Sequence, residues 1–171
     1  MSIIERLKAH REAQTLKLLS NSLYTKQYHL NYITSNSAFN IPYRGMQCDW
    51  HQVDMLSGGQ YVTHPTNFIG AEDIFYDYGL WDCSEWFSVN GIKKESLCAT
   101  PIRAILDKLY YELAIYDCYP KIFDDFWNYM FDELDIDELR GKLQILKNHL
   151  KPHQQAWLTQ WETKNEIYQR G

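Results

Sequence analysis

The chain has 171 residues, of which 45% are hydrophobic and 23% are charged, and its formal net charge is −5. A disordered chain has fewer large apolar residues and a larger net charge, and a membrane-spanning helix needs about 18 consecutive apolar residues, which no stretch approaches. A chain of this length buries a sizeable core without disulfides or metals. We therefore expect one compact domain over residues 1–171. We place it in the cytoplasm, because charged residues interrupt the N-terminal apolar run that an export signal needs.

The N-terminal half is predicted to contain one helix and then irregular structure. Residues 1–23 show a thin apolar stripe at helical spacing. Residues 24–99 lose that periodicity and are punctuated by glycines, so we expect loops and short strands there, with 28–34 and 61–63 as strand candidates. Asn90-Gly91, which follows an apolar run, is the dipeptide that a two-residue hairpin turn prefers.

Residues 100–170 are predicted to form an array of about four amphipathic helices. The first has Thr100 as its N-cap and Pro101 at its first position, and it should end near Pro120. The second covers 122–134 and carries a broad apolar stripe.

The third helix is predicted to begin at an aspartate version of the capping box, Asp135 with Glu138, and the fourth at Pro152. The expected fold class is therefore mainly α, with a small irregular β-containing centre, and α+β is the alternative.

Charge is distributed unevenly along the chain. The formal charge is +3 over residues 1–30, −11 over 31–140 and +3 over 141–171. Residues 45–92 hold seven acidic residues and no Lys or Arg, and residues 122–139 hold seven more without a basic one. Like charges at helical spacing repel each other, so these two acidic blocks favour a basic partner, and a solvated helix face is the alternative for the second block.

The main functional hypothesis is a cytosolic binding protein that blocks a basic protein, such as a nuclease toxin or another nucleic-acid-binding enzyme, in the manner of immunity-type or anti-defence-type inhibitors. Aromatic side chains beside carboxylates would anchor such a partner. No cofactor is expected, and direct binding of nucleic acid is disfavoured because the centre lacks clustered Lys and Arg. The predicted partner-binding residues are Asp73, Tyr76, Asp77, Tyr78, Trp81, Asp82, Glu85, Asp124, Asp125, Asp132 and Glu133.

The alternative hypothesis is a small metal-dependent hydrolase. Its candidate ligands offer carboxylate and imidazole atoms within a short segment, and they are Asp49, His51, Asp54 and His64. Their spacing matches no defined metal-binding loop. The four cysteines form no C-x-x-C pair, and we expect them to be reduced and mostly buried.

Overall fold

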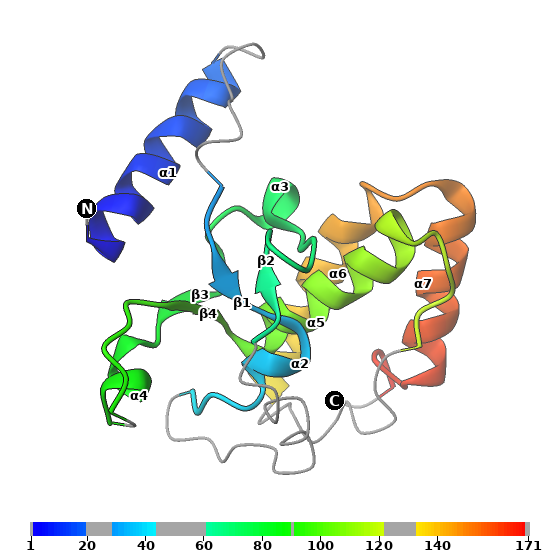
Figure 1. Ribbon diagram of the computed structural model, residues 1–171. Helices are drawn as coiled ribbons and strands as arrows, with labels where there is room; N and C mark the ends of the chain where they lie inside the picture. Colours follow the sequence, from blue (N-terminus) through cyan, green and yellow to red (C-terminus); the bar gives the residue numbers. More distant parts are fainter. Residues whose placement is uncertain (1, 20–28, 44–60, 90, 122–132, 170–171) are drawn as a thin grey trace.

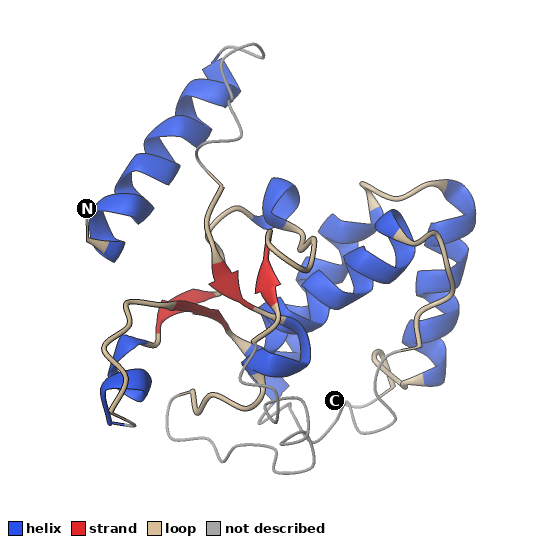
Figure 2. Ribbon diagram, in the orientation of Figure 1, coloured by secondary structure: helices blue, strands red, loops and turns tan. Residues whose placement is uncertain are grey.

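The structure is a computed structural model that describes residues 2–19, 29–43, 61–89, 91–121 and 133–169. Helices predominate in these residues and surround a small four-stranded sheet, so the fold is mainly α with some β (Figures 1 and 2). The elements in chain order are α1 (Ile3–Leu19), β1 (Tyr32–Ile33), α2 (Ser35–Ala38), β2 (Thr63–His64), α3 (Glu72–Phe75), β3 (Leu80–Asp82), α4 (Ser84–Val89), β4 (Leu97–Ala99), α5 (Pro101–Tyr110), the π-helix η3 (Tyr111–Ile115), α6 (Glu133–Lys147) and α7 (Pro152–Lys164).

The sheet has the strand order β2-β1-β4-β3. The central pair β1 and β4 is parallel, and each edge strand is antiparallel to its neighbour. Tyr32 of β1 therefore lies between His64 of β2 and Leu97 of β4. This register brings residues from three distant parts of the sequence to one place, and all three are buried.

Helix α5 is the centre of the core, and it begins as the sequence predicts. The Thr100 hydroxyl accepts a hydrogen bond from the Arg103 amide at 3.3 Å, and Pro101 occupies the first turn. The helix packs against α2, α6 and β4, and most of its side chains are buried. It continues directly into η3, so helical backbone ends at Ile115, slightly before the predicted Pro120.

The start of α6 corrects the predicted capping box. The helix begins at Glu133, which places Asp135 inside its first turn, where a side chain cannot act as N-cap. Helix α7 starts at Pro152, as predicted. The second predicted helix, over 122–134, lies almost wholly outside the described residues.

The predicted hairpin at Asn90-Gly91 is wrong on its first arm, because residues 84–89 form the helix α4. Asp82 provides the reason: its Oδ1 atom accepts a hydrogen bond from the Ser84 amide at 2.9 Å and so caps a helix at this point. The other two strand candidates are confirmed in part, since β1 lies within 28–34 and β2 overlaps 61–63 at Thr63.

Helix α1 stands at one side of the molecule, where it projects beyond the sheet (Figure 1). Ile3, His10 and Ala13 are the side chains that it buries among those described. Two ion pairs add to this contact, Arg6 with Glu95 at 3.7 Å and Arg11 with Asp77. The helix is thus attached by a few residues on one face.

Three cysteines lie in the described residues, and all three are free thiols. Cys83 and Cys98 are buried and Cys118 is half-buried. Burial raises the pKa of the Cys98 thiol well above its usual value, because a thiolate is poorly solvated there. The expectation of reduced, mostly buried cysteines is confirmed for these three.

Candidate functional site

One carboxylate, that of Glu72 at the start of α3, gathers three histidines from separate parts of the chain. His64 Nε2 lies 2.8 Å from Glu72 Oε2, and His29 Nδ1 contacts the same oxygen. The other oxygen accepts a hydrogen bond from the Leu30 amide at 2.9 Å and lies 3.5 Å from His10 Nδ1. We call these four side chains, His10, His29, His64 and Glu72, the imidazole–carboxylate centre.

The imidazole–carboxylate centre is almost sealed from solvent. The side chains of His10 and Glu72 are each 1% exposed, that of His64 is 4% exposed, and that of His29 is 23% exposed. His29 is therefore the member of the centre through which solvent or a ligand reaches it. His64 also stacks on Tyr32, with ring centroids 4.9 Å apart, so the neighbouring strand β1 holds its ring in place.

Glu72 is ionised despite its burial. Burial by itself raises the pKa of this carboxyl, but hydrogen bonds from His64, the Leu30 amide and His29 outweigh it and lower the pKa to about 2. The geometry also fixes the proton on His64. Its Nδ1 atom accepts a hydrogen bond from the Gly70 amide at 2.9 Å, so the ring proton sits on Nε2 and is donated to Glu72.

A second buried charged group lies next to the centre. Arg103 and Asp107, both fully buried on α5, form an ion pair with 2.8 Å between Nε and Oδ1. Arg103 also donates to the backbone carbonyls of Tyr76 and Tyr78 and to the Tyr32 hydroxyl. Burial opposes the charge on Arg103, but Asp107 and Tyr32 raise its pKa above its usual value. The guanidinium is therefore charged, and each of its three nitrogens donates at least one hydrogen bond.

Three consecutive residues connect the two groups. The Gly70 amide donates to His64, the Ala71 amide donates to Asp107 Oδ1 at 2.8 Å, and Glu72 holds the imidazoles. No other residue fits at position 70, because a Cβ there would lie 2.6 Å from the Tyr32 hydroxyl and 2.8 Å from Asp107 Cγ. The two charged groups are thus packed against one backbone segment.

Among the described residues 72–89, the first predicted acidic block divides into an internal and an external half. In the internal half, Asp77 pairs with Arg11, and the Tyr78 hydroxyl donates to Glu138 while Lys142 lies over its ring. The Tyr76 carbonyl accepts from Arg103. The side chains of Asp77 and Tyr78 are therefore engaged within the chain, whereas Tyr76 is engaged through its backbone, and Asp73 is the exposed acid of this half.

The external half lies at the edge strand β3 and on α4. Asp82 and Glu85 are exposed there, and Trp81 is half-buried against Tyr43, with ring centroids 5.4 Å apart. Two apolar side chains follow on the same segment, Val89 at 79% and Ile92 at 48% exposure. We call this surface, formed by Trp81, Asp82, Glu85, Val89 and Ile92, the β3–α4 edge.

The remaining predicted residues are only partly visible. Asp124, Asp125 and Asp132 lie outside the described residues, as do three of the four predicted metal ligands, Asp49, His51 and Asp54. Glu133 begins α6, but its side chain is outside the described part. The fourth candidate ligand, His64, is found in the imidazole–carboxylate centre.

Comparisons with known proteins give no match for this chain. No protein-family model, curated protein or solved structure matches this chain. Within the described part, the helices are too short or too polar to cross a membrane. The function is therefore argued from the geometry of the two sites.

Proposed function

We propose that the protein is a cytosolic binding protein that blocks a basic protein, such as a nuclease toxin or another nucleic-acid-binding enzyme, and that the β3–α4 edge is its contact surface. The observation that carries the proposal is the combination of exposed acids with exposed apolar side chains on one short segment. Asp82 and Glu85 are exposed beside Val89 at 79% and Ile92 at 48% exposure. Apolar contact area beside exposed carboxylates is a composition that a basic protein surface complements.

The proposed contact surface is smaller than the set of partner-binding residues predicted from the sequence. Asp77 and Tyr78 have partners within the chain, so they are not the side chains that a partner meets first. The β3 strand, by contrast, is at the edge of the sheet, and its Asp82 and the neighbouring Glu85 are exposed, with Lys93 and Lys94 following Ile92 on the same segment. Their negative charge therefore steers a basic partner toward this edge.

The first experiment identifies the partner and removes the charge. The immobilised protein is incubated with a lysate of its own organism at low and high salt, and the retained protein is identified by mass, purified and titrated directly. Combining Asp82→Asn with Glu85→Gln should weaken the affinity about tenfold, slow association and flatten the salt dependence. Asp82→Asn keeps the oxygen that caps α4, so the fold is undisturbed.

Two further sets of variants separate contact from general surface chemistry. Val89→Ser with Ile92→Ser should raise the dissociation rate, because these side chains supply apolar contact area. Asp137→Asn and Ile145→Ser change one exposed acid and one exposed apolar residue on α6, and should leave binding unchanged. Equal affinities for the edge variants and the α6 variants would show that the partner binds elsewhere.

A further inference from the structure

Three side chains of the imidazole–carboxylate centre present metal-binding atoms to one point. His29, His64 and Glu72 each offer one such atom, and these atoms all lie within 4.8 Å of one another. They come from the segment before β1, from β2 and from α3, and two of the three side chains are buried. Surface acids gather by chance, but burying an imidazole against an ionised carboxylate, with a second imidazole on the same oxygen, requires the fold to assemble them.

We propose that His29, His64 and Glu72 bind a divalent transition metal, and that zinc is the ion that fits them. Two imidazole nitrogens and one carboxylate oxygen are a ligand set that zinc accepts, whereas magnesium and calcium prefer oxygen ligands alone. Three protein ligands leave one coordination position open, and His29, at 23% side-chain exposure, gives that position access to solvent. The site is separate from the β3–α4 edge, and the proposal does not depend on the proposed function.

The protons of the centre must move when the metal enters. The His64 proton sits on Nε2 because Nδ1 accepts from the Gly70 amide. When Nε2 binds the metal, this proton passes to Nδ1, and two N–H groups would then face each other unless the Gly70 bond breaks. Nδ1 of His29, which contacts the same Glu72 oxygen, must likewise be without a proton to bind the metal.

Zinc binding is therefore coupled to the backbone at Gly70. A glycine peptide can reorient through conformations closed to other residues, and no side chain fits at position 70 in any case. The neighbouring Ala71 amide remains bonded to Asp107, so the change is confined to the peptide between residues 69 and 70. The Gly70 amide is thus a local reporter of metal at the centre.

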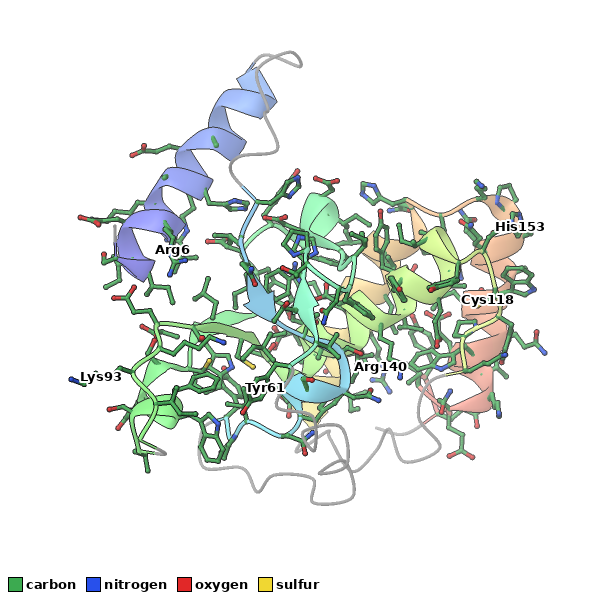
Figure 3. The ribbon with its side chains drawn as sticks, in the orientation of Figure 1. Arg6, Tyr61, Lys93, Cys118, Arg140 and His153 are labelled. Carbon is green, nitrogen blue, oxygen red and sulfur yellow. The ribbon has the colours of Figure 1, made fainter. Side chains whose placement is uncertain are left out.

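The test is a titration of the whole protein, freed of metal by chelator, with zinc sulfate and separately with magnesium chloride. Wild type should bind one zinc per chain with a dissociation constant on the order of 1 µM or below, and magnesium should not compete. His29→Ala should weaken zinc binding roughly 100-fold. The matched control is His153→Ala, because His153 also contacts a carboxylate, Asp117, at 2.7 Å, but lies on the surface at the far end of the molecule from α1 (Figure 3).

A second measurement follows the Gly70 amide by NMR with and without zinc. Its resonance should shift and its hydrogen exchange should accelerate when zinc is added, and a chelator should reverse both changes. The proposal is overturned if wild type shows no saturable zinc binding at about 100 µM, if His29→Ala binds zinc as tightly as wild type, or if His153→Ala loses binding equally. The wild-type titration decides the question even if a variant fails to fold.

Discussion

At the scale of single residues, Glu72 makes folding dependent on pH. Its pKa is about 2 in the folded protein and about 4.5 when unfolded, so the unfolded chain binds the proton first as pH falls. The stability that Glu72 contributes is complete above pH 4.5 and is lost progressively as pH falls toward 2. Between pH 6 and pH 3.5 this loss is about 1 kcal/mol.

Urea unfolding at these two pH values measures the contribution of Glu72. Glu72→Gln should be less stable than wild type at pH 6 and should lose about 1 kcal/mol less on going to pH 3.5. Glu12→Gln, which removes an exposed carboxylate on α1, should keep the wild-type pH dependence. Parallel pH dependences for wild type and Glu72→Gln would mean that other groups govern the acid sensitivity.

Two Arg–Asp pairs each lie within one helix, Arg103–Asp107 on α5 and Arg140–Asp137 on α6, and they differ in burial. Removing their carboxylates should therefore lower the stability of the protein by different amounts. Asp107→Ala leaves the fully buried Arg103 without its carboxylate and should destabilise the protein by about 3–5 kcal/mol. Asp137→Ala removes the exposed partner of Arg140 and should cost less than about 1 kcal/mol. Denaturant unfolding with both variants in parallel checks the contrast, and similar losses would show that the buried pair is no stronger than the surface pair.

The same buried residues explain what the sequence did not predict about the site. Glu72 was counted with six other acids of the first block and was not among the predicted site residues, yet it contacts all three histidines of the imidazole–carboxylate centre. His10, His29 and His64 are too far apart in sequence for their spacing to indicate a shared site. Arg103 and Asp107 did carry a signal, since they are opposite charges four residues apart on α5 and therefore lie on one face of the helix.

At the scale of elements, replacing each of two glycines by alanine should change the stability of the protein in opposite directions. Gly79, before β3, has a φ of +69°, and a Cβ there would lie 2.7 Å from Arg103 Cβ and 3.0 Å from the Thr100 hydroxyl. Gly79→Ala should therefore destabilise the protein by about 2 kcal/mol or more through strain and overlap. Gly141 lies on the exposed side of α6, where a Cβ meets nothing within 4 Å.

Gly141→Ala should stabilise the protein by about 0.5–1 kcal/mol, because alanine loses less backbone entropy in a helix. Thermal unfolding of both variants beside wild type gives the two signs directly. If Gly79→Ala were stabilising, the turn before β3 would relax freely. The expectation that a side chain at position 79 strains the packing against Arg103 would then be wrong.

The elements that were predicted correctly are those whose deciding interactions are local in the sequence. Helices α5 and α7 were predicted because Thr100, Pro101 and Pro152 are local start signals and the stripes that follow are regular. Helix α4 was predicted as a strand because Asn90-Gly91 resembled a hairpin turn, while the deciding contact was the Asp82 cap. The parallel pairing of β1 with β4 has no local signal, because the strands are about sixty residues apart in sequence.

At the scale of the whole molecule, the basic ends fold back on the acidic centre. Arg6 pairs with Glu95 and Arg11 with Asp77, both linking α1 to the middle of the chain. From the other end, Lys142 of α6 lies 3.8 Å from the centroid of the Tyr78 ring. Part of the opposite charge that the sequence assigned to an external partner is therefore supplied internally, and Asp73, Asp82 and Glu85 are the acids of the first block that are exposed among its described residues.

This charge pattern predicts that salt loosens α1 selectively. Its two ion pairs are exposed and hence screened, whereas α5 is held by buried contacts. Raising NaCl from about 0.05 M to about 0.5 M should lower the hydrogen-exchange protection of α1 roughly twofold and leave that of α5 unchanged. Combining Arg6→Gln with Arg11→Gln should make α1 protection insensitive to salt. If salt changed α1 and α5 alike, or if the double variant kept the wild-type response, the buried contacts of Ile3, His10 and Ala13 would be what holds α1 in place.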